Sequence, residues 1–109
     1  MVCADSGAFY TCGQQANAFV NRGNVFRHSI FKDIRNTGTG GCQGNSMPVS
    51  GLYLDDQSSG WSIENNTFVN MSMGILLGCG KQNSIRRNHF QYCDLAVHFD
   101  NRAMTWEKP

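Results

Sequence analysis

Three stretches of the chain repeat one pattern, and this repeat constrains the fold more than any other feature. Residues 24–34, 61–71 and 83–93 align without a gap, and the last two copies start 22 residues apart. A unit this short cannot bury its own apolar side chains, so successive copies must stack on one another. The stacking predicts three interior columns: Phe26, Ile63 and Ile85; Phe31, Phe68 and Phe90; and Ile34, Met71 and Cys93.

A second repeated element accompanies the first. Residues 7–11, 51–55, 74–78 and 96–100 are short apolar strands, each opened by a small residue. Alternation along a strand sends successive side chains to opposite faces. It predicts inward columns of Ala8, Leu52, Ile75 and Val97, and of Tyr10, Leu54, Leu77 and Phe99. It predicts outward columns of Phe9, Tyr53, Leu76 and His98, and of Thr11, Asp55, Gly78 and Asp100.

These two elements predict an all-β solenoid, a parallel β-helix of three to four coils of 22–23 residues. We interpret residues 1–109 as a single domain and as an uncapped piece of a longer protein. A Gly-rich insertion at 37–50 interrupts the period and is expected to leave the coil as a loop.

Between the inward columns of the first repeat lies a polar column of Ser29, Asn66 and Asn88. Stacked amides at equivalent turns can hydrogen-bond along the solenoid axis. The alternative is that asparagine tolerates the left-handed backbone of a tight turn.

Composition excludes several classes of function. The formal net charge is +1, so we expect neither a nucleic-acid partner nor a polybasic membrane patch. The five cysteines show no C-x-x-C spacing, so we expect no metal site among them. Cys93 falls in an interior column and is predicted to be a buried thiol.

Several motifs carry a resemblance to a known family. They are Asp5-Ser6-Gly7-Ala8-Phe9-Tyr10, Gly51-Leu52-Tyr53-Leu54-Asp55-Asp56, Gly78-Cys79-Gly80-Lys81 and His98-Phe99-Asp100-Asn101-Arg102 with Trp106. With its coil length and Asn-x-Phe turns, the chain resembles the right-handed parallel β-helix proteins of the pectin-lyase-like superfamily. The resemblance implies an extracellular parent protein that acts on a polysaccharide or another glycan, with this chain as part of one monomer.

The candidate catalytic residues are Asp55, Asp56 and Asp100. Strands stack about 4.8 Å apart, so Asp55 and Asp100 should lie two coils, roughly 9.6 Å, apart on one outer wall. Inverting glycosidases hold their two carboxyl groups about 6.5–9.5 Å apart. We expect Gly78 between them to leave a notch for a sugar. The candidate substrate-binding residues are Tyr53, His98, Lys81 and Arg102.

Three alternatives remain open at this point. The aspartates can cap turns by accepting backbone N–H groups. They can also hold Ca²⁺ beside a Lys or Arg base if the protein is a lyase, whereas a hydrolase needs no cofactor. Finally, the chain can be a non-catalytic module with a glycan-binding or structural role.

Overall fold

The computed structural model describes residues 7–12, 23–35, 49–56 and 58–100. Every strand pairing in these ranges is parallel. The eight strands are β1 (Gly7–Cys12), β2 (Val25–Arg27), β3 (Ile30–Ile34), β4 (Ser50–Asp55), β5 (Ser62–Glu64), β6 (Thr67–Leu77), β7 (Ser84–Arg86) and β8 (His89–Phe99). No helix in the described ranges is long and apolar enough to cross a membrane.

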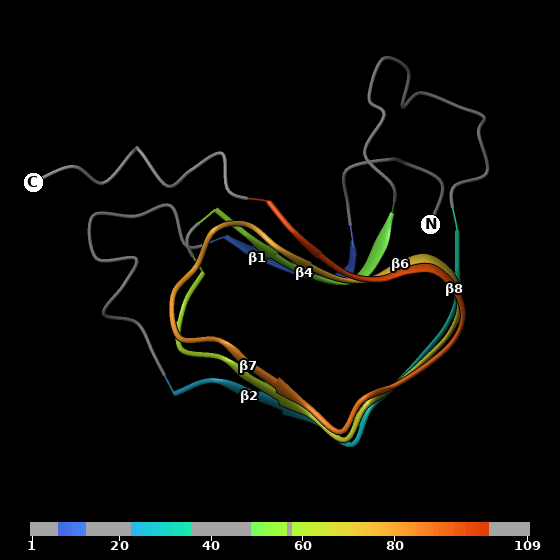
Figure 1. Ribbon diagram of the computed structural model, residues 1–109, viewed down its shortest axis with the longest axis horizontal. Coiled ribbons are helices and arrows are strands. Elements are labelled where there is room, and N and C mark those ends of the chain that lie inside the picture. The colour runs from blue at the N-terminus through green and yellow to red at the C-terminus, as the bar shows by residue number, and fades with distance from the viewer. Residues whose placement is uncertain (1–6, 13–22, 36–48, 57, 101–109) are drawn as a thin grey trace, which may run out of the picture.

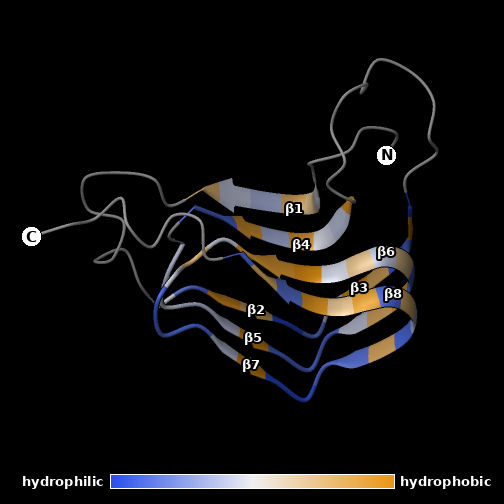
Figure 2. Ribbon diagram, turned by 45° about the horizontal axis from the view of Figure 1, so that its top comes forward, coloured by the Kyte–Doolittle hydropathy of each residue, from blue (hydrophilic) through white to orange (hydrophobic). Residues whose placement is uncertain are grey.

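The strands form two parallel sheets, which are two walls of the solenoid. One sheet has the order β1-β4-β6-β3 with β8 also paired to β6, and the other has the order β2-β5-β7. Seen down the axis, successive turns of the chain superimpose around a common interior (Figure 1). In a tilted view the strands of each wall lie one above another (Figure 2). The predicted parallel β-helix is confirmed.

The aromatic column predicted from the repeat forms the centre of the core. The rings of Phe31 and Phe68 are 4.9 Å apart and nearly parallel, and those of Phe68 and Phe90 are 5.0 Å apart. Strand register also aligns Ile34, Met71 and Cys93 as predicted. Cys93 is only partly buried, and its thiol donates to the Phe68 carbonyl at 3.5 Å.

The polar column is a hydrogen-bonded ladder. The Asn66 side-chain oxygen accepts the Ser29 N–H at 3.0 Å, and the Asn88 side-chain oxygen accepts the Asn66 N–H at 3.0 Å. The side-chain amide of Asn66 also donates to the Phe26 carbonyl at 2.9 Å. Because these bonds follow the axis from coil to coil, the predicted asparagine ladder is confirmed.

The register predicted for the first strand is wrong by one residue. Phe9 pairs with Leu52 and Tyr10 with Tyr53, whereas the sequence alignment had matched Ala8 with Leu52. Phe9 therefore packs against the core, while Ala8 and Tyr10 are exposed. The physical reason is size: the large Phe9 side chain fills the interior position that Ala8 would have left empty.

Two further details differ from the expected coil. The two repeated elements fuse in the later coils into the 11-residue strands β6 and β8. Each bends where a residue adopts positive φ, at Asn70 (56°) and Tyr92 (56°). The expected loop at 37–50 is shorter at its end, since Ser50 already begins β4, and positions 37–48 lie outside the described residues.

Candidate functional site

The candidate acids lie on one rim of the solenoid, where strands of the larger sheet end. Cys12 at the end of β1 pairs with Asp55 at the end of β4. The next coils place Gly78 and Asp100 at equivalent positions, since Gly78 N–H donates to the Leu54 carbonyl at 2.7 Å and Asp100 N–H to the Leu77 carbonyl at 2.8 Å. The register therefore runs Cys12, Asp55, Gly78, Asp100, with Cys12 where Thr11 was expected.

Asp55 is fixed by hydrogen bonds to both carboxylate oxygens. The Tyr10 hydroxyl donates to Oδ2 at 2.6 Å, and the Asp56 N–H donates to Oδ1 at 2.9 Å. The bond to Asp55, with partial burial and the charge of that carboxylate, raises the pKa of Tyr10 well above its ordinary value. Tyr10 therefore stays a proton donor that orients Asp55. The bond from Asp56 N–H is the turn-capping contact that had been weighed against catalysis.

The space over Gly78 is not a notch. A Cβ atom at this residue would lie 2.5 Å from the Asp56 nitrogen and 3.1 Å from the Asp55 carbonyl carbon. The chain of the preceding coil thus already fills the position where a sugar was expected to approach. Glycine is required here because the Asp55–Asp56 turn passes so close to the next coil.

Three side chains at this rim converge on one point. Ligand atoms of Cys12, Asp55 and Asp56 all lie within 4.8 Å of one another. Asp56 has a φ of 25°, which turns the chain at the end of β4. Cys12 is exposed, while the two aspartates are half-buried. The group combines a thiol with two carboxylates at the end of adjacent strands.

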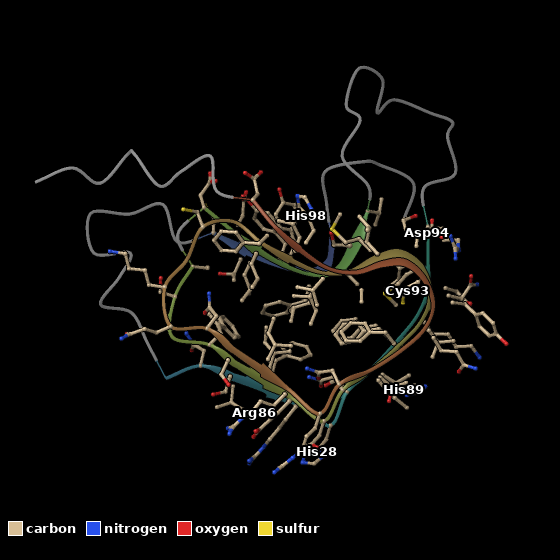
Figure 3. All side chains as sticks on the ribbon, in the orientation of Figure 1. His28, Arg86, His89, Cys93, Asp94 and His98 are labelled. Atoms are coloured by element: carbon tan, nitrogen blue, oxygen red, sulfur yellow. The ribbon has the colours of Figure 1, made fainter. Side chains whose placement is uncertain are left out.

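The residues predicted to point outward beside this rim, such as Tyr53 and Leu76, are more buried than expected. Tyr53 is 1% exposed and forms a second apolar cluster with Met73 and Leu76. Its ring face is therefore covered in this structure, whereas Tyr10 is 50% exposed and meets the Tyr53 ring at 5.1 Å, edge to face. His98 lies two strands beyond Tyr53 in the same row and points away from the interior (Figure 3).

Two predicted substrate-binding residues remain, Lys81 and Arg102. Lys81 is exposed in the turn after β6, where its backbone N–H donates to the Ser59 hydroxyl at 2.9 Å. Arg102 lies outside the described residues.

Sequence reasoning missed Cys12 and Tyr10 as members of this rim. The cause was the one-residue error in the first strand, which placed Thr11 beside Asp55. A usable signal existed: matching Ala8 rather than Gly7 with the small residue Gly51 aligns Phe9 with Leu52 and brings Cys12 opposite Asp55.

Comparison with known proteins assigns a family. The family model described as "Periplasmic copper-binding protein (NosD)" matches residues 11–105, which is most of the chain. No curated protein and no solved structure matches the chain. The family is periplasmic, which agrees with the predicted location outside the cytoplasm. Its fold, a right-handed parallel β-helix, agrees with the stacked parallel sheets described above. The chain belongs to the NosD family of periplasmic copper-binding proteins.

Proposed function

We propose that the chain contributes a metal-binding site to an extracytoplasmic β-helix, with Cys12, Asp55 and Asp56 as ligands. The observation that carries this proposal is the convergence of the three ligand atoms within 4.8 Å. The family description, which names copper, supports the same chemistry independently of the geometry.

The donor set fits copper better than calcium. Calcium and magnesium are bound by oxygen ligands alone, whereas a thiolate favours Cu(I) or Zn²⁺. Among divalent first-row metals, Cu²⁺ binds a given site of nitrogen, oxygen or sulfur ligands most tightly. Cys12 would supply the soft ligand that a calcium site lacks, and Asp55 and Asp56 would supply two oxygen ligands.

The neighbouring residues hold this donor set in place. Tyr10 fixes the orientation of Asp55 through its 2.6 Å bond, and the Asp56 N–H fixes the other carboxylate oxygen. Both oxygens keep further lone pairs, since a carboxylate oxygen can accept more than one bond. Orienting contacts of this kind commonly tune metal affinity.

The test is a metal titration of the full chain under reducing conditions, with Cu(I), Zn²⁺ and Ca²⁺ compared by competition with a chelator. Cys12→Ser is expected to weaken copper binding by at least about tenfold, and Asp56→Asn by a smaller factor. Matched controls are Cys93→Ser and Asp100→Asn, which change the same groups outside the cluster. Equal copper affinity in Cys12→Ser and the parent chain would exclude this site.

A second candidate is glycan hydrolysis with Asp55 and Asp100 as the acid and base. It is favoured by one observation: Asp55 ends β4 and Asp100 follows the end of β8 on the same rim, with Gly78 in the coil between them. Its expected sugar platform is Tyr10 rather than Tyr53, since Tyr10 is 50% exposed and Tyr53 is 1% exposed.

Single Asp55→Asn and Asp100→Asn variants of the full chain, assayed against a broad panel of polysaccharides, test this candidate. Loss of turnover with an unchanged melting curve supports hydrolysis. Loss of folding supports turn capping, and absence of turnover by the parent chain ends the proposal.

A further inference from the structure

Basic side chains collect along the smaller sheet and the turns that lead from it into β3 and β8. The register of β2, β5 and β7 aligns Arg27, Glu64 and Arg86. The following turn positions carry His28 and Arg87, and His89 opens β8. Figure 3 shows His28, Arg86 and His89 pointing away from the coil interior. We call Arg27, His28, Arg86, Arg87 and His89 the basic strip.

The strip is accessible and only partly neutralised. All five side chains are exposed. Glu64 lies between the arginines, but its side chain is 22% exposed and approaches Arg86 only at 3.5 Å. In the described part of the smaller sheet and its turns, three arginines accompany one carboxylate, that of Glu64. Asp55 lies in the larger sheet, and Asp56 and Asp100 follow strands of that sheet, whereas Arg27 and Arg86 lie in the smaller sheet.

The spacing of the strip is set by the fold. Aligned residues of adjacent coils lie about 4.8 Å apart, so Arg27 and Arg86 lie about 9.6 Å apart along the solenoid axis, with Glu64 in the coil between them. Arginine presents a planar fork of donors that matches carboxylate and sulfate groups. A row of this kind suits a linear chain with repeated negative groups better than a single small anion.

We propose that the basic strip binds a linear anionic glycan that carries carboxylate or sulfate groups. The basic strip contains no phenylalanine, tyrosine or tryptophan, so only its two histidine rings and its guanidinium groups could stack on the bases of a single-stranded nucleic acid. The periplasmic character of the family also places a glycan, rather than a nucleic acid, within reach. This surface is separate from Cys12 and the aspartates, so it does not depend on the function proposed above.

The test measures binding of the full chain to immobilised polygalacturonate and heparin, with dextran as the neutral glycan. We expect binding to both anionic glycans, weakening as salt rises, and none to dextran. The double variant Arg86→Gln with Arg87→Gln should bind about tenfold more weakly, with an unchanged melting curve.

A variant that is expected to bind the glycan more tightly provides a second test. Asn65 occupies the turn position between His28 and Arg87, with φ of 57° against 55° at Arg87. An arginine already adopts this backbone conformation one coil away, so Asn65→Arg should fold and bind about twofold to threefold more tightly. The matched charge control is Lys32→Gln, an exposed residue aligned with Val69 on the neighbouring wall, which should leave binding unchanged.

Several results would overturn the proposal. They are no binding to either anionic glycan, equal binding to dextran, or an equal loss in Lys32→Gln, which would show a general charge effect. Tighter binding to a single-stranded oligonucleotide or to phosphatidylserine vesicles would assign the strip to another class of partner and also overturn it.

Discussion

Arg35 and Asp94 form an ion pair across two coils, with Arg35 Nη1 3.0 Å from Asp94 Oδ2. On its way the guanidinium also donates to Asn70 Oδ1 at 2.7 Å and to the Tyr92 carbonyl at 2.8 Å. One side chain from the end of β3 therefore connects three successive coils at the bend where Asn70 and Tyr92 adopt positive φ. These contacts hold the bends of successive coils in register.

Arg35→Met is expected to lower the free energy of unfolding by about 1–2 kcal/mol, because it removes three hydrogen bonds from a site that is partly open to solvent. Asp94→Asn should cost less than about 1 kcal/mol, since its side chain is 66% exposed and solvent screens the pair. Denaturant unfolding of both variants measures the difference. Equal costs would show that the ion pair, rather than the bonds to Asn70 and Tyr92, carries the effect.

Asn66→Ala should destabilise the chain by about 1–3 kcal/mol. Asn66 is 1% exposed, and its loss leaves the Ser29 N–H and the Phe26 carbonyl without their partner. The exposed Asn24→Ala, at a residue without positive φ, is the control and should change stability far less. Thermal unfolding monitored by circular dichroism makes the comparison. A similar melting shift in both variants would contradict a special role for the ladder.

Gly78→Ala should destabilise the chain by about 1–3 kcal/mol, since the added methyl group meets backbone atoms of Asp55 and Asp56 that cannot move aside freely. It should also weaken copper binding by displacing the two proposed ligands. Gly23→Ala is the control: it has open space but a φ of 89°, so it carries strain far from the site. Copper titration of the two variants separates the effects, because only Gly78→Ala is expected to change affinity.

Alkaline pH should reveal the bond between Tyr10 and Asp55. The folded pKa of Tyr10 lies above its unfolded value, so the folded chain retains a proton that the unfolded chain releases. The stability from this bond is complete below the unfolded pKa of about 10 and is lost as pH rises through the folded pKa. Tyr10→Phe should therefore lose less stability than the parent chain between pH 9 and pH 11, roughly the window around an ordinary tyrosine.

Denaturation midpoints of both proteins at these two pH values give the comparison. Other groups also titrate in this window, so the difference between the two proteins is the quantity that matters. Parallel losses in the parent chain and Tyr10→Phe would show that Asp55 does not hold the phenol proton.

The repeated pattern was sufficient to predict the coil and its interior. Phe31, Phe68 and Phe90 occupy equivalent places in the repeat, and stacking is the arrangement that buries all three. The ladder of Ser29, Asn66 and Asn88 followed from the same alignment. The register of the first strand was predicted wrongly because β1 has only six residues, and either Gly7 or Ala8 is small enough to be the residue that opens it.

The one-residue error in the register of β1 changed which residues the candidate site contains. A shift of one residue sends every side chain of a strand to the opposite face, so it exchanged Thr11 for Cys12 beside Asp55 and moved Tyr10 outward. The sequence also indicated where the aspartates lie along the chain, but it did not reveal that the Asp55–Asp56 turn fills the space above Gly78.

The amino-acid order by itself determined the coil, its aromatic centre and its asparagine ladder, because these depend on a period that recurs in the chain. Only the tertiary structure decided which side chains meet at the rim and which basic side chains gather along the smaller sheet and its turns. Those contacts join residues more than 40 positions apart, such as Tyr10 and Asp55, and depend on strand register and side-chain volume rather than on any local pattern.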